Sequence, residues 1–146
     1  MAETTGSASI DINASPEAVY GILTDLSRIS ELSPECYQAE WEGDSTGPKV
    51  GASYRGYNRA GDNEWDIAVN VVAAEPGRAW AFEVPSPDAP TQWAYAIEAT
   101  DGGCRVTESF DAPVLAEERF QEMGRHQMLV ANIETTLQNL KTAAES

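Results

Sequence analysis

The sequence predicts an α+β fold in which a curved, seven-stranded antiparallel sheet wraps around a long C-terminal helix, with two short helices after the first strand. Three observations predict this fold. A short strand pattern is followed at once by helical spacing, about seventy residues then alternate with a period of two, and the chain ends in good helix formers. Because twist accumulates by about 20–25° per strand pair, such a sheet curls and can leave a space beneath the helix.

The first strand is predicted over residues 7–13, where Ile10 and Ile12 share one face. The residues before it are small and polar, so we expect residues 1–6 to form a flexible N-terminus. The length of 146 residues is typical of one folded unit. We therefore expect a single domain over residues 7–144.

Two short helices are predicted after this strand. Ser15 is a helix-capping residue type, and the proline that follows it suits the first helical position. Apolar side chains then recur at helical spacing as far as Leu26. A second helical turn is predicted over residues 27–32, and Pro34 ends it.

Six further antiparallel strands are predicted between Tyr37 and Asp111, where apolar and polar side chains alternate. Residues typical of turns separate them, most clearly in residues 43–51, 58–63 and 101–103. Each aromatic ring on an inner face either fills the core or lines a pocket, since both would share that face. So many rings with polar tips are what an apolar cavity with a few orienting donors would need.

One helix of about 28 residues is predicted from Leu115 to Ala144, since no proline occurs there and only Gly124 interrupts the helix formers. Pro113 ends the sheet before it. We expect the apolar stripe of this helix to cover the sheet, with two polar side chains beside it. The stripe comprises Phe120, Met123, Val130, Ile133, Leu137 and Leu140, and the polar neighbours are His126 and Gln127.

The charge of the chain excludes some partners. Nine basic residues against 24 acidic ones give a formal net charge of −15. Such a surface repels phosphate backbones and anionic headgroups, so we expect no nucleic-acid partner. No stretch is long and apolar enough for membrane insertion, and the start lacks the pattern of a secretory signal, which favours a cytoplasmic location.

Metal and cofactor sites have little support in the sequence. Cys36 and Cys104 do not form a CxxC motif, and His126 is the only histidine, so we expect free thiols and no metal. No glycine-rich phosphate-binding motif or nucleophile elbow is present, and no cofactor is predicted. The sequence leaves a monomer and a homodimer equally open.

Motifs along nearly the whole chain resemble a known family. They include residues 12–19 before the first helix, Ser33-Pro34-Glu35-Cys36, residues 51–61, residues 103–109 and Leu137-x-x-Leu140-Lys141. In this order they resemble the SRPBCC or START-like superfamily, in particular its bacterial polyketide cyclase/dehydrase and lipid transport branch. The resemblance implies the helix-grip fold of the birch-pollen-allergen group and a small hydrophobic ligand as partner, bound between the sheet and the C-terminal helix.

The candidate ligand-binding residues follow from the inner strand faces and the helix stripe. They are Trp41, Tyr54, Trp65, Trp80, Phe82, Trp93, Tyr95, Glu108, Met123, His126, Gln127 and Val130.

Candidate catalytic residues are Glu108, His126 and Tyr95, which can give or take protons. Glu108 stands between two apolar neighbours on an inner face, where an ionised carboxylate is costly. It either orients a ligand or works as an acid or base, or else it pairs with an arginine or reaches solvent at a strand end. His126 is either a proton donor or a plain half-buried histidine, and Arg119 either anchors a carboxylate or offsets nearby acids at the surface.

Three functions remain open from the sequence. The first is binding of a small hydrophobic or aromatic ligand such as a lipid, a polyketide or a related metabolite. The second is a polyketide aromatase/cyclase-type enzyme that promotes aldol cyclisation and dehydration, and the third is a protein-interaction module with a filled core. A cavity above about 300 Å³ favours the first two. Convergence of Glu108, His126 and a tyrosine hydroxyl would favour the enzyme.

Overall fold

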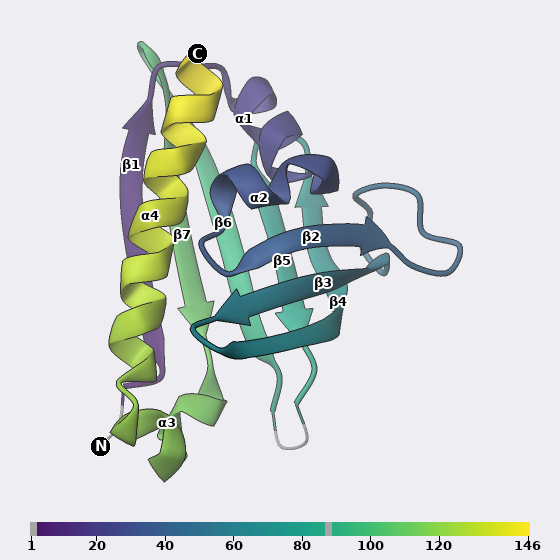
Figure 1. Ribbon diagram of the computed structural model, residues 1–146. Helices are drawn as coiled ribbons and strands as arrows, with labels where there is room; N and C mark the ends of the chain where they lie inside the picture. Colours follow the sequence, from purple (N-terminus) through teal and green to yellow (C-terminus); the bar gives the residue numbers. More distant parts are fainter. Residues whose placement is uncertain (1–2, 87–88) are drawn as a thin grey trace.

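The computed structural model describes residues 3–86 and 89–146, and it is built on a curved seven-stranded antiparallel sheet (Figure 1). The strands lie in the spatial order β1-β7-β6-β5-β4-β3-β2. From β2 to β7 each strand therefore pairs with the next one in the sequence, and β1 pairs with β7 to form the edge opposite β2. This arrangement confirms the predicted α+β fold. The strands are β1 (Thr5–Ile12), β2 (Cys36–Trp41), β3 (Ser53–Ala60), β4 (Asn63–Glu75), β5 (Ala79–Val84), β6 (Thr91–Thr100) and β7 (Gly103–Asp111).

The edge strand β1 begins two residues earlier than the sequence pattern indicates. Thr5 pairs with Asp111 and Gly6 with Phe110, so both belong to the sheet. A Cβ atom at Gly6 would stand 2.6 Å from the Phe110 ring, and the glycine leaves room for that ring. Residues 1 and 2 of the expected flexible N-terminus lie outside the described residues.

Strand β4 joins two differently oriented parts of the sheet. Its first part, up to Asn70, pairs with β3, and its last part pairs with β5. The register shifts between Val71 and Ala73, and such an irregularity bends a strand and increases its twist. Figure 1 shows the result: β2 and β3 run across the long strands and curl over the concave face.

Three short helical segments follow β1: α1 (Pro16–Leu23), the 3₁₀ turn η1 (Leu26–Arg28) and α2 (Ile29–Leu32). The predicted cap is confirmed, since Ser15 Oγ accepts a hydrogen bond from the backbone N–H of Ala18. α1 and α2 pack against the C-terminal helix, and Asn139 donates to the carbonyl of Leu32 at 3.0 Å. They therefore cover the same side of the sheet as that helix.

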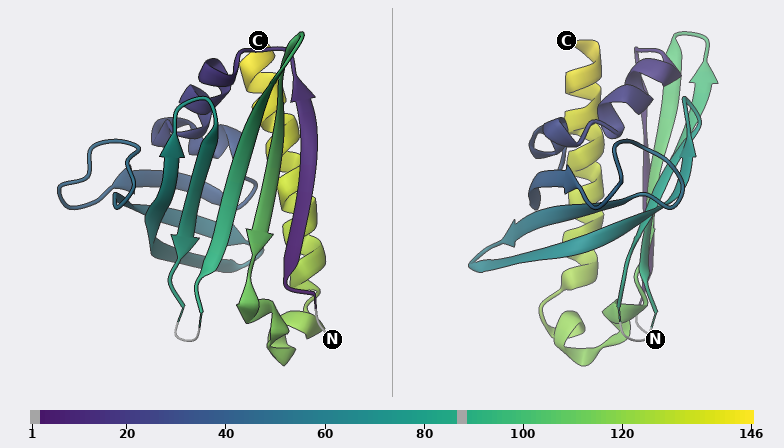
Figure 2. Two further views of the ribbon diagram at one scale, coloured as in Figure 1. Left: turned by 180° about the vertical axis from the view of Figure 1, so that it is seen from behind. Right: turned by 90° about the vertical axis from the view of Figure 1, so that its right-hand side faces the viewer.

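The prediction of one uninterrupted helix from Leu115 to Ala144 is wrong. The segment divides into the 3₁₀ turn η2 (Pro113–Ala116), α3 (Glu118–Glu122) and α4 (Arg125–Glu145). Gly124 separates the last two. Its φ of +68° is a left-handed backbone conformation that is strained for residues with a side chain. The chain thus turns at Gly124, and only α4 lies along the sheet, beside β1 and β7 (Figure 2).

The core has two parts. The larger cluster packs α1, α2 and the C-terminal half of α4 against the sheet, and the smaller one joins Phe110, Leu115, Leu129 and Ile133. Met123, expected in the helix stripe, is 49% exposed because it belongs to the segment before α4. Within the described residues, no helix has the length and hydropathy that a membrane crossing requires.

Candidate ligand-binding cavity

A cavity of about 620 Å³ lies between the curved sheet, the α1–α2 segment and α4. The predicted space beneath the helix is therefore present. Its wall is mainly apolar and draws on both core clusters, from Leu23 and Leu32 on one side to Leu129 and Ile133 on the other. Such a chamber has the size and lining typical of sites for small organic ligands.

Eight of the candidate residues line this cavity. The rings come from β3, β4, β5 and β6, and the carboxyl comes from β7, because alternate positions of each strand face inward. Their role in binding stays a prediction. They are Tyr54, Trp65, Trp80, Phe82, Trp93, Tyr95, Glu108 and Met123.

Four candidate residues lie elsewhere. Trp41 packs edge-on against Tyr54, 5.9 Å between ring centroids, and stands behind the cavity wall. His126, Gln127 and Val130 line a shallow groove on the outer side of α4. At the start of α4, position 125 rather than position 126 faces the cavity.

His126 is held at the N-terminal edge of the protein. Its Nε2 atom lies 2.8 Å from the carbonyl oxygen of Thr5 and 3.5 Å from a carboxylate oxygen of Glu3. Its ring stacks edge-on against Phe110, which separates it from the cavity. The convergence of His126 with Glu108 that would favour the enzyme is therefore absent.

Glu108 is the most unusual group in the cavity wall. It is only 3% exposed, and its Oε1 atom has no hydrogen-bond partner among the described residues. Burial raises the pKa of this carboxyl to about 8, and the hydroxyl of Tyr95, its cross-strand neighbour, offsets part of that rise. At neutral pH the group is therefore mainly the uncharged acid, which has an O–H to donate.

The tyrosines beside Glu108 keep their protons as well. Burial and the nearby carboxyl raise the pKa of Tyr95 well above its ordinary value, and burial raises that of Tyr54. The alternatives that Glu108 pairs with an arginine or reaches solvent are both excluded within the described residues. The inner part of the cavity thus contains hydroxyl and carboxyl groups that are neutral near pH 7.

A second polar cluster stands on another part of the wall, and the sequence did not reveal it. Arg125 donates from Nη1 and Nη2 to the two carboxylate oxygens of Glu35 at 2.6 and 2.8 Å, and Asn132 Nδ2 donates to the same carboxylate at 2.8 Å. The Arg125 and Glu35 side chains are each 14% exposed. The guanidinium group also lies over the ring of Trp65, 5.9 Å from its centroid.

Local sequence explains how this cluster is positioned. Ser33 adopts an extended backbone before Pro34, and its Oγ atom accepts hydrogen bonds from the N–H groups of Glu35 and Cys36. This turn directs Glu35 toward α4. Arg125 is the first residue of α4, directly after the left-handed Gly124.

Three segments form the more exposed end of the cavity: the β3–β4 hairpin, the end of β5, and α3 with Met123. Trp65 is 37% exposed and Met123 49% exposed at this end. Arg119 also lines it, but its side chain is 71% exposed, donates to Glu117 at 3.1 Å and lies over the ring of Phe120. Of the two roles that the sequence left open for Arg119, the structure therefore supports the offsetting of nearby acids at the surface.

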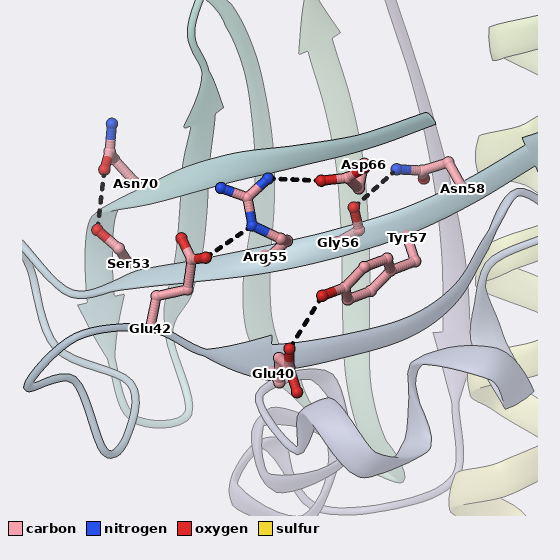
Figure 3. A network of polar contacts seen from close by, with 9 residues as sticks. All are labelled: Glu40, Glu42, Ser53, Arg55, Gly56, Tyr57, Asn58, Asp66 and Asn70. Atoms are coloured by element: carbon pink, nitrogen blue, oxygen red, sulfur yellow. Dashed lines mark hydrogen bonds and ion pairs between the residues drawn. The ribbon is translucent and has the colours of Figure 1, made fainter. Parts of the chain in front are cut away.

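The opposite face of the sheet carries many of the acidic residues. Arg55 donates to Glu42 and to Asp66 at 2.7 Å each, and Tyr57 donates to Glu40 at 3.0 Å. Figure 3 shows these contacts. The residues that alternate with these along β3 line the cavity instead. The acidic surface and the apolar chamber are thus separated by a single layer of backbone.

The chain is similar to a known protein family. Residues 3–145 match the protein family described as polyketide cyclase / dehydrase and lipid transport. The chain belongs to this family. Membership confirms the resemblance drawn from the sequence motifs, while no curated protein is significantly similar to the chain.

Solved structures of other proteins share the architecture. A polyketide cyclase-like protein of Corynebacterium glutamicum is 26% identical, with a TM-score of 0.65 over 96% of this chain and 91% of that one. A protein of Chromobacterium violaceum is 17% identical, with a TM-score of 0.73 over 99% of both chains. The di-domain ARO/CYC protein StfQ of the steffimycin pathway is 15% identical, with a TM-score of 0.76 over 97% of this chain and 50% of that one. At these low identities, the Chromobacterium violaceum protein and StfQ show that the fold is shared.

Proposed function

We propose that this protein binds a small, largely apolar or aromatic molecule in the cavity between its sheet and α4. One observation carries the proposal: a chamber of about 620 Å³ with an aromatic lining remains open inside an otherwise packed core. Folded interiors are close-packed, so an unfilled apolar volume of this size serves a purpose other than stability. Its volume exceeds the roughly 300 Å³ that distinguishes a ligand site from a filled interaction module.

Titration with the neutral fluorescent probe N-phenyl-1-naphthylamine tests this proposal. We expect saturable binding that raises the probe fluorescence and quenches tryptophan emission, because Trp80 and Trp93 line the cavity. Ile67→Phe places a larger side chain in the cavity and should weaken probe binding at least about tenfold. Val72→Phe is the matched control, since it adds the same ring at an exposed position of the same strand.

The outcome that contradicts the proposal is equally clear. If the wild-type protein does not bind the probe, or if both variants bind it as tightly as wild type, the cavity is not the site. Circular dichroism and a thermal melt must first show that both variants keep the fold.

A cyclase or dehydratase activity is the second candidate, and Glu108 favours it. Aldol cyclisation and dehydration need a proton donor positioned on the substrate, and a carboxyl with a pKa of about 8 is protonated at neutral pH yet can exchange its proton. Tyr95 lies beside it and can share this work. Family membership and the fold shared with StfQ support the candidate.

Incubation of the protein with a short poly-β-ketone thioester tests for this activity. We expect faster appearance of the cyclised, dehydrated product than in buffer, measured by chromatography, and a loss of at least about 100-fold in rate in Glu108→Gln. Equal rates with wild type, Glu108→Gln and no protein would remove the enzymatic candidate and leave the binding function.

A further inference from the structure

We propose that the cavity selects its ligand by charge: it takes uncharged molecules that present an oxygen acceptor to Glu108, and it excludes carboxylates of the same size. This inference rests on the proposed binding function and names the ligand class. It combines three observations: an unpartnered buried carboxyl oxygen, a fully engaged arginine, and a mainly apolar wall.

The first step concerns what Glu108 lacks. Glu108 lines the cavity, its buried Oε1 atom has no hydrogen-bond partner in the described part of the chain, and buried polar groups in native proteins are almost always paired. The side chain that acts on this carboxyl is Tyr95 on β6, which has Tyr54 nearby, and neither tyrosine is a cation. The carboxyl group of Glu108 is therefore available to pair with a ligand.

The second step concerns the charge of that partner. With a pKa near 8 the carboxyl is mainly protonated at pH 7, so it donates its O–H to an acceptor such as a ketone, hydroxyl or ether oxygen. A ligand carboxylate would instead need a cation to replace its lost hydration. The overall charge of −15 further disfavours the approach of anions.

The third step shows that the arginines at the cavity are already engaged. Arg125 uses both terminal nitrogens on Glu35, in a bidentate pair that an incoming anion would have to break. Arg119 is mostly exposed at the outer end and donates to Glu117. Within the described residues, Arg119 and Arg125 are the basic side chains that line the cavity. An apolar acid would thus be buried without a counter-charge.

Matched naphthalene derivatives test the inference by calorimetric titration of the wild-type protein at pH 7. We expect 2-acetylnaphthalene to bind and 2-naphthoate to bind at least about 30-fold more weakly, because the two molecules differ in charge and hardly in size. The affinity for 2-acetylnaphthalene should fall about tenfold between pH 7 and pH 9, as a carboxyl with a pKa of about 8 ionises and loses its donor.

Glu108→Gln separates the charge of this residue from its shape. The amide keeps an N–H donor at every pH, so the variant should bind 2-acetylnaphthalene with little change between pH 7 and pH 9. The other titratable groups at the cavity are Cys36, Tyr54, Tyr95, Arg119 and the Glu35–Arg125 pair, and they are unchanged in the variant. A pH dependence that persists in Glu108→Gln would assign it to one of them and overturn the role of Glu108.

Several results would overturn the inference while leaving the proposed function intact. Equal affinity for 2-naphthoate and 2-acetylnaphthalene would show that charge is not selected. Tight binding of 2-naphthoate that Arg125→Met abolishes would show that Arg125 opens to receive anions. Tighter binding of 2-(aminomethyl)naphthalene than of the ketone would show that Glu108 acts as an anion. Failure of every neutral probe, N-phenyl-1-naphthylamine included, would overturn the proposed function itself.

Discussion

Glu108 and Glu35 reach the same cavity from different parts of the sheet, one in β7 near the β1 edge and the other just before β2 at the opposite edge. Glu35 accepts three hydrogen bonds, two from Arg125 and one from Asn132. Glu108 has a cross-strand tyrosine and an oxygen with no partner. The two carboxyls therefore differ in what the protein itself supplies to them.

Glu35 is therefore a structural carboxylate, whereas Glu108 has an oxygen that no group among the described residues pairs with. The Glu35 cluster ties the segment after α2 to the start of α4 across 90 residues of sequence, where it helps hold the break at Gly124 in place. Glu108 makes no such connection and costs stability when it ionises, since a buried charge needs pairing. A costly group that no structural contact explains is a candidate for function.

The largest expected effect is on the pH dependence of stability in Glu108→Gln. The folded-state pKa of about 8 lies above the ordinary 4.5, so between these values the native state holds more protons than the unfolded state. Wild-type stability should therefore fall as the pH rises from about 5 to 8. The amide cannot ionise, so the stability of Glu108→Gln relative to wild type should rise by up to about 4 kcal/mol across that window.

Urea unfolding of both proteins at pH 5 and pH 8 measures this change. Glu98→Gln on the exposed face of β6 is the control, because solvent hydrates that carboxyl and its loss should matter little at either pH. A stability difference between Glu108→Gln and wild type that is the same at both pH values would show that Glu108 is ionised, or hydrated, in the folded protein.

The sequence predicted one of these two carboxyls and missed the other. Glu108 could be found because Val106 and Phe110 flank it with a period of two, so the face of the strand is set by local pattern. Glu35 and Arg125 lie 90 residues apart, one in a turn and one at a helix start, where no periodicity links them. Their contact depends on how the sheet curls, which is a property of the whole fold.

The helix break shows the same limit. A single glycine is tolerated inside a helix, and Gly124 alone does not predict whether the helix continues. The structure places it in the left-handed region, and directly after it Arg125 faces the cavity while His126 lies outside. The sheet, the short helices and the aromatic lining could be predicted from local patterns, whereas the break before α4 could not.

The second largest effect is expected from Arg125→Met. The substitution leaves the Glu35 carboxylate largely buried without its cation, which should destabilise the protein by about 3 kcal/mol in urea unfolding at pH 7. The double variant Glu35→Gln/Arg125→Met removes both charges and should recover part of that loss. If Arg125→Met is as stable as wild type, the pair contributes no more than an exposed ion pair.

A smaller effect is expected from Asn132→Leu. This variant removes one hydrogen bond to Glu35 and keeps the Arg125 pair, so it should cost about 1 kcal/mol in the same assay. Asn139→Leu is a matched control on the same helix, because it removes a hydrogen bond to the Leu32 carbonyl that does not involve the cluster. Combined with Arg125→Met, Asn132→Leu should be non-additive, whereas Asn139→Leu should add.

The smallest effect is expected from Arg119→Gln. The sequence left two roles open for this arginine, to anchor a carboxylate or to offset nearby acids at the surface. Its guanidinium is 71% exposed and bonded to a half-exposed Glu117, so removing the charge should change the unfolding free energy by less than about 0.5 kcal/mol. Affinity for N-phenyl-1-naphthylamine should also stay within about twofold of wild type, since the side chain stands at the outer end of the cavity.

The contrast with Arg125→Met is what matters, because both arginines line the same cavity and both bind a glutamate. If Arg119→Gln destabilised the protein as much as Arg125→Met, burial would not be what distinguishes the two pairs. If it abolished probe binding, the ligand would lie at the outer end rather than beside Glu108.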